Sequence, residues 1–99
     1  MLMKTVLASM VLLFAASANG GDIAAGKAKS GLCAGCHGSA GISGNDLWPN
    51  LAGQKVGYLK NQLKLFRSGK RSDPMMAGIS KSLSDQDIDN LASYYASLK

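Results

Sequence analysis

The sequence is poor in the residues that usually cross-link small domains or bind metal ions. Its 99 residues include only two cysteines, Cys33 and Cys36, and one histidine, His37. Two cysteines three positions apart cannot build a disulfide framework, and a structural zinc site wants four protein ligands. These scarcities exclude a disulfide-stapled scaffold, a zinc module and a site with two imidazoles on one metal ion.

The chain also lacks an apolar run long enough to span a bilayer comfortably, which takes about 20 residues. Its longest apolar stretch, residues 6–16, follows Lys4 and precedes a small-residue A-x-A site that ends at Ala18. These three features together are typical of a secretory signal peptide. We therefore predict that residues 1–18 are a cleaved signal peptide and that residues 19–99 form the mature domain in the periplasm, with no membrane span after cleavage. An uncleaved membrane anchor is the alternative.

Acidic residues are few. There are six of them against eleven lysines and arginines, which gives a net charge of +5. Much of the positive charge lies in one segment, which contains Lys55, Lys60, Lys64, Arg67, Lys70 and Arg71. A nucleic-acid surface is not expected in an exported protein. A docking surface for acidic partner proteins fits better, because charge steers weak and fast encounters. The simpler alternative is a solvated helix face.

No stretch has the alternating apolar pattern of a strand, and helix signals account for most of the mature chain. We predict helices over about residues 23–30, 56–67 and 76–81, and a last helix capped by Ser84 with Asp87 as its capping-box acid. The predicted class is all-α, one domain with three or four helices and long loops. A domain of roughly 80 residues buries only ~60–65% of its unfolded surface, so a large apolar cofactor would complete its core.

One motif contains residues that can bind a cofactor. It is the C-x-x-C-H run Cys33-Ala34-Gly35-Cys36-His37. Its spacing lets two thiols add to the two vinyl groups on one edge of a porphyrin, and it places an imidazole beneath the iron. A thioredoxin-like redox pair would need a βαβ context, which is absent from the helical pattern. We therefore predict one haem c, attached covalently through Cys33 and Cys36, with His37 as an axial iron ligand.

The second axial position of that iron can hold methionine, lysine or solvent, or it can be empty. Met75 and Met76 are the only methionines left once the signal peptide is removed. Either can instead be core filler, but a thioether ligand would raise the potential of the iron. An iron with both axial positions filled has no place for oxygen or substrate. This favours an electron-transfer protein over an enzyme.

Further segments, together with the C-x-x-C-H run, resemble the class I cytochromes c. The resemblance is to the small bacterial monohaem proteins and to one half of the periplasmic dihaem cytochromes. It rests on Cys33 to Gly38, Pro49 to Gly53, Tyr58-Leu59 with Gln62-Leu63, Arg71 to Met76, and Leu83 to Asp85 with Leu91 to Tyr95. It implies the class I fold, with helices wrapped around one haem whose iron has His/Met ligation.

The resemblance also implies roles for single residues. Aligned on the segment that begins at Leu83, it indicates Met76 rather than Met75 as the axial ligand. It implies that the carbonyl of Pro49 accepts the Nδ1 proton of His37 and so orients the imidazole ring.

The sequence does not decide the positions of three aromatic residues. The first and last helices are expected to cross where Gly26 faces an aromatic residue. The resemblance indicates Tyr94 for that residue, whereas helical periodicity favours Tyr95. Trp48 packs either on the haem edge or in the ordinary core.

The function that these features imply is electron transfer. We expect a periplasmic carrier, a monomer or weak dimer, that cycles its haem iron between Fe(III) and Fe(II) and docks with acidic redox partner proteins. One alternative is a haem c subunit of a larger redox enzyme complex. Another is a gas-binding or sensor cytochrome with an open iron. Class II cytochromes of that kind carry C-x-x-C-H near the C-terminus, whereas here it lies near the N-terminus.

Overall fold

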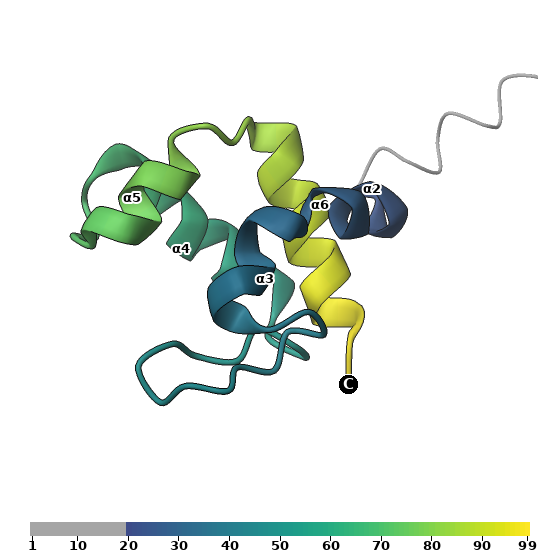
Figure 1. Cartoon of the computed structure of the whole chain (residues 1–99). Coiled ribbons are helices and arrows are strands. Elements are labelled where there is room, and N and C mark those ends of the chain that lie inside the picture. The colour runs from purple at the N-terminus through teal and green to yellow at the C-terminus, as the bar shows by residue number, and fades with distance from the viewer. Residues whose placement is uncertain (1–19) are drawn as a thin grey trace, which may run out of the picture.

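The computed structural model describes residues 20–99, which form five helices joined by loops (Figure 1). The helices are α2 (Ile23–Lys29), α3 (Gly31–His37), α4 (Val56–Ser68), α5 (Pro74–Ser80) and α6 (Asp85–Ser97). The all-α prediction is confirmed. The predicted number of helices was too low, because the segment around the C-x-x-C-H run forms a helix of its own. The predicted signal peptide lies outside the described residues.

None of the helices within residues 20–99 combines the length and the hydropathy that a bilayer crossing requires.

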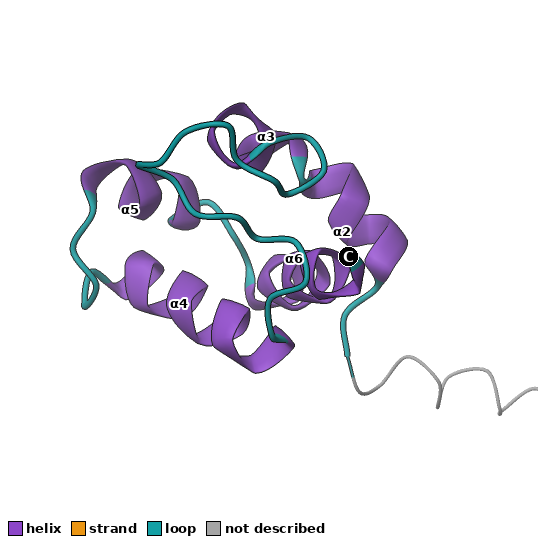
Figure 2. Cartoon of the chain, turned by 90° about the horizontal axis from the view of Figure 1, so that it is seen from below, coloured by secondary structure: helices purple, strands orange, loops and turns teal. Residues whose placement is uncertain are grey.

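Helices α2 and α6 pack across one another and form the most extensive helix–helix contact (Figures 1 and 2). Gly26 lies at the crossing point. A Cβ atom at this position would be 2.0 Å from the carbonyl oxygen of Asn90 and 2.7 Å from the Cβ of Tyr94. Only a residue without a side chain permits this approach. The structure therefore pairs Gly26 with Tyr94, and it leaves Tyr95 for another face of α6.

The N-terminus of α6 carries the predicted capping box. The Asp87 backbone N–H donates to Ser84 Oγ, and the Ser84 N–H donates to Asp87 Oδ2, each over 3.0 Å. Both bonds satisfy backbone donors that the helix itself leaves unpaired. The carboxylates of Asp85 and Asp87 also lie in the first turn, where the helix dipole favours negative charge.

Helix α4 packs against both α5 and α6. On its apolar face Leu59 and Phe66 point inward. The helix is followed by Gly69, whose φ of 82° suits a left-handed C-cap. The buried core lies mainly along α6. Its members are Leu59, Leu83, Ile88, Leu91, Ala92, Tyr94 and Tyr95.

Two side chains of the basic segment form ion pairs within the chain. Lys60 Nζ lies 3.3 Å from Asp89 Oδ1. Arg67 lies 2.6 Å from Asp85 Oδ1 and also donates to the carbonyl oxygen of Leu83 over 3.0 Å. These contacts join α4 to α6 and to the turn before it. The basic segment is therefore not one continuous solvated face.

Candidate haem site

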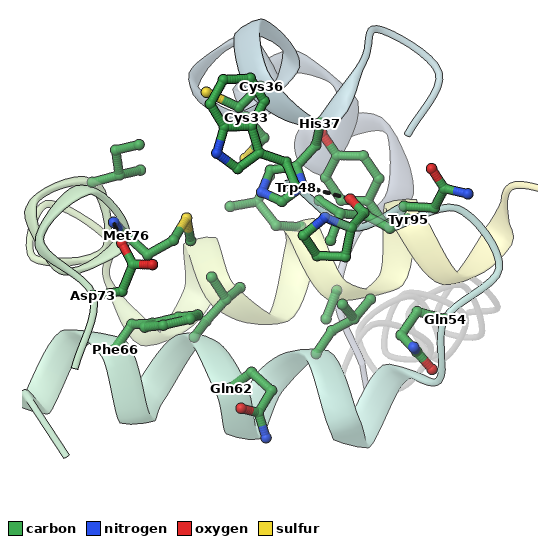
Figure 3. A pocket seen from close by; sticks show the side chains of 18 of the residues that line it. Cys33, Cys36, His37, Trp48, Gln54, Gln62, Phe66, Asp73, Met76 and Tyr95 are labelled. Carbon is green, nitrogen blue, oxygen red and sulfur yellow. Dashed lines mark hydrogen bonds between the residues drawn. The ribbon is translucent and has the colours of Figure 1, made fainter. Parts of the chain in front are cut away.

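A cleft of about 380 Å³ lies between the α3 side of the molecule and helices α4, α5 and α6 (Figure 3). Its volume is within the range of about 300–1,000 Å³ that is usual for cofactor sites. Each of the three helices contributes apolar side chains to its wall. These are Leu59, Leu63 and Phe66 from α4, Ile79 from α5, and Leu91 and Ala92 from α6.

The α3 wall carries the C-x-x-C-H residues. Cys33, Cys36 and His37 all line the cleft, because residues at i, i+3 and i+4 of a helix share one face. The helix ends at His37 and is followed by Gly38, which has a φ of 90°. A Cβ atom there would lie 2.0 Å from the carbonyl oxygen of Ile42. Glycine thus allows the chain to turn sharply directly after His37.

His37 is buried, and its Nδ1 lies 2.7 Å from the carbonyl oxygen of Pro49. Because a carbonyl oxygen can only accept, Nδ1 must carry the proton. The other ring nitrogen, Nε2, is then left with a lone pair that can bind a metal ion. This is the contact between Pro49 and His37 that the resemblance implied.

Met75 and Met76 lie at the start of α5, and both line the cleft. The carboxylate of Asp73 accepts hydrogen bonds from both backbone N–H groups, each over 3.0 Å, which fixes the first turn of the helix. Met75 is 54% exposed, whereas Met76 is half-buried. Figure 3 shows Met76 on the opposite side of the cleft from His37.

The two cysteines are free thiols and are half-buried. Burial raises the pKa of Cys33. The ring of Tyr95 lies beside Cys33 and is only 3% exposed. Its hydroxyl has no hydrogen-bond partner among residues 20–99. A buried unpaired hydroxyl on the wall of a cleft indicates a site that is completed by another group.

The cleft also contains residues that the sequence pattern did not place in the site. Arg71 was assigned to the basic docking segment, yet it lines the cleft together with Gln62 and Phe66. Its Nη1 donates to Gln62 Oε1 over 2.6 Å, and its guanidinium lies 4.5 Å from the centroid of the Phe66 ring. Arg71 and Gln62 belong to the segments that carry the resemblance to the class I cytochromes c. That membership could have indicated that they lie in the site. Trp48, for which the sequence allowed two positions, lines the cleft and is half-buried.

The donor set fits a haem. Two thiols and an imidazole share one face of α3, a thioether lies across the cleft, and the walls between them are apolar. A hard cation such as Ca²⁺ would instead need several oxygen ligands. Sulfur and imidazole ligands combined with apolar walls are what an iron porphyrin attached through two cysteines requires.

Comparison with known proteins gives the same result. Residues 23–99 match the family model described as cytochrome c. The chain is 46% identical to cytochrome c4 of Pseudomonas aeruginosa over 79 residues, which cover 80% of this chain and 39% of that protein. It is 41% identical to cytochrome c-554(548) of Halomonas halodenitrificans over 80 residues, which cover 78% of this chain and 96% of that protein.

A solved structure, cytochrome c4 of Acidithiobacillus ferrooxidans, superimposes with a TM-score of 0.74 and 32% identity over 83% of this chain and 53% of that one. The chain thus spans about two fifths of the first cytochrome c4 and about half of the second. Given the family match and these identities, the chain belongs to the cytochrome c family, whose cofactor is covalently bound haem c.

Proposed function

We propose that this protein is a one-electron carrier that performs no bond chemistry on a substrate. The observation that carries the proposal is the shared helical face of Cys33, Cys36 and His37, which lines an apolar cleft with Met76 on the far side. When bound, the haem iron supplies a reversible one-electron step between Fe(III) and Fe(II).

Each residue of the site has a proposed role in binding the haem. Cys33 and Cys36 would hold the haem through thioethers, each formed by addition of an S–H bond across a vinyl group. His37 Nε2 and the Met76 sulfur would bind the iron, with Met75 as the alternative to Met76. The Pro49 carbonyl, 2.7 Å from His37 Nδ1, keeps the proton on that nitrogen and orients the ring.

The environment of the site suits electron transfer. If His37 and Met76 both bind the iron, no site on the iron would remain for a substrate. The thioether ligand and the apolar walls both disfavour the extra positive charge of Fe(III) and so raise the potential. The edge of the site near Cys33 and Cys36 is the proposed port through which the electron leaves.

The remaining proposals concern location and partners. We infer that residues 1–18 are a cleaved signal peptide and that residues 19–99 act in the periplasm as a monomer or weak dimer. Removal of Lys4 with the signal peptide lowers the net charge from +5 to +4 before the haem is added. A basic carrier is suited to redox partners that are acidic at the docking surface.

The intact mass of the secreted protein tests the proposal directly. We expect the mass of residues 19–99 plus one haem when a host competent in cytochrome maturation makes the protein. The variant Cys33→Ser/Cys36→Ser is the control and should carry no haem. A wild-type chain secreted by the same host without added haem mass would refute covalent attachment, and with it the carrier function.

Charge reversal near the cleft tests the acidic partner. Lys60 is unsuitable because it is paired with Asp89. Lys70 is exposed and precedes the cleft residue Arg71. Lys70→Glu should slow reduction by an acidic donor at low salt, and high salt should remove the difference. Lys27→Glu, on α2 away from the cleft, is the matched control. Equal rates for both variants would argue against docking at this surface.

A haem subunit of a larger redox enzyme complex is the second candidate. The observation that favours it is a set of exposed apolar side chains around the cleft, which a permanent partner could cover. They are Leu32, Leu47, Tyr58 and Met75. Purification from the native source separates the two candidates. A carrier should elute alone, whereas a subunit should co-purify with a partner in fixed stoichiometry.

A further inference from the structure

We propose that the Tyr95 hydroxyl is a positioning group of the haem site that donates a hydrogen bond to the Cys33 sulfur of the thioether. By doing so it raises the reduction potential of the haem. The inference deepens the proposed function and rests on haem attachment through Cys33.

Tyr95 is held on several sides. Its ring leaves α6 towards α3 (Figure 3) and is 3% exposed. Its backbone carbonyl accepts a hydrogen bond from Gly53 N–H over 2.9 Å. At Gly41 a Cβ atom would lie only 3.1 Å from the Tyr95 ring. The phenol therefore cannot turn out to water without displacing the loop between α3 and α4.

The Tyr95 hydroxyl makes no hydrogen bond to the protein's own described groups. Tyr95 Oη is buried and has no hydrogen-bond partner among the described residues, and such groups are rare because they lose water without replacement. Its polar neighbours are Cys33, Ser30 and Tyr94. The Ser30 hydroxyl donates to the Lys27 carbonyl oxygen over 2.7 Å and makes no hydrogen bond with Tyr95.

Attachment of the haem changes the role of Cys33. A free thiol has a weak donor as well as a weak acceptor, whereas a thioether sulfur can only accept. The buried phenol O–H is then the complementary donor. Its positive end would face a sulfur that is bonded to the porphyrin edge. Reduction adds an electron to the haem, and a fixed donor dipole in an apolar site stabilises that electron.

Tyr94 provides a matched control. The two rings are neighbours, with centroids 5.0 Å apart. Tyr94 packs where α2 and α6 cross at Gly26, and it is not among the residues that line the cleft. The substitutions Tyr94→Phe and Tyr95→Phe each remove one phenolic oxygen from adjacent positions. Only the second removes an oxygen beside the Cys33 sulfur.

The experiment compares both variants with the wild-type holoprotein. Intact mass first establishes that haem is attached, so that a failure of the proposed function is recognised separately. Tyr95→Phe is expected to lower the reduction potential and to shift the thioether C–S band in the resonance Raman spectrum, whereas Tyr94→Phe changes neither. A haem-loaded Tyr95→Phe protein with the wild-type potential and C–S band would overturn the inference.

A second measurement needs no substitution, in case Tyr95→Phe fails to fold. In the reduced low-spin protein, which is diamagnetic, the Tyr95 O–H proton should exchange slowly with water. It should also give a cross-peak to the Cys33 β-protons in the NMR spectrum. A Tyr95 hydroxyl proton that exchanges at the rate of an exposed phenol and lacks this cross-peak would overturn the inference.

Discussion

His37 illustrates how a single contact can set the properties of a side chain that is proposed to bind iron. Its Nδ1 lies 2.7 Å from the carbonyl oxygen of Pro49, twelve residues further along the chain. The carbonyl fixes the proton on Nδ1 and orients the ring, so that the lone pair is on Nε2. A short backbone contact thereby determines which nitrogen can bind iron.

The assignment of Met76 as the axial ligand can be tested at the same scale. Met76→Ala should abolish the weak red absorption of the sulfur–Fe(III) bond and lower the potential, because the thioether favours Fe(II). Met75→Ala is the matched control, since Met75 is 54% exposed and should leave both properties nearly unchanged. Visible spectra and redox titration measure the outcome. The reverse pattern in the two variants would assign Met75 as the ligand.

At the scale of elements, the crossing of α2 and α6 depends on an absent side chain. Gly26→Ala would place a Cβ 2.0 Å from the Asn90 carbonyl oxygen, so the helices must move apart. We expect a loss of about 1–3 kcal/mol of stability, as is usual for overpacking, measured by denaturant titration of the holoprotein.

Gly57→Ala is the control for that substitution. Gly57 lies within α4, and a Cβ atom there would meet nothing within 4 Å. This variant should be neutral or stabilised by up to about 1 kcal/mol, because alanine is the better helix former. A Gly26→Ala protein as stable as the wild type would contradict the close packing of α2 on α6.

The capping box of α6 predicts a pH dependence. The hydrogen bond from the Ser84 N–H lowers the pKa of Asp87. A carboxyl whose pKa is lower in the folded state stabilises the fold above its unfolded pKa of about 3.9. That stabilisation is lost as the pH falls further, through the folded pKa. Asp87→Asn should therefore lose less stability than the wild type between about pH 5 and pH 2.

Thermal unfolding of the holoprotein over this pH range measures the effect. Asp46→Asn is a suitable control. Asp46 lies in the exposed loop between α3 and α4, and no described hydrogen bond or ion pair involves its carboxylate. If Asp87→Asn followed the acid unfolding curve of the wild type, the charge of Asp87 would not contribute through the cap.

For the molecule as a whole, the main structural feature is a cleft that the protein's own side chains do not fill. A space of about 380 Å³ lies within an all-α domain whose buried core runs mainly along one helix, α6. An apolar side chain contributes about 1.5–3 kcal/mol when it is fully buried rather than exposed to water. The total stability of a domain is only about 5–15 kcal/mol, so several wall residues left facing water would remove a large part of it.

We therefore expect the chain to depend on its cofactor for folding. The variant Cys33→Ala/Cys36→Ala, which cannot attach haem, should lose its cooperative thermal transition and much of its near-UV circular dichroism. Proteolysis should cut it faster than the holoprotein. A cooperative transition near the melting temperature of the holoprotein would show that the fold does not need the cofactor to fill the cleft.

The sequence alone was sufficient for features that depend on neighbours within one turn. Cys33, Cys36 and His37 share a face because of helical spacing. The capping box of Ser84 and Asp87 is equally local. The all-α class follows from the same periodicity. The axial role of Met76 stays a prediction, and the proposed signal peptide lies outside the described residues.

Only the tertiary structure decided which distant groups meet. It paired Gly26 with Tyr94, turned Tyr95 towards Cys33, and engaged Lys60 with Asp89. It also brought Arg71 to the cleft, although the residue had been counted with the docking charges. Periodicity fixes the face of each helix but not the helix that covers it, because that choice depends on packing between segments far apart in the chain.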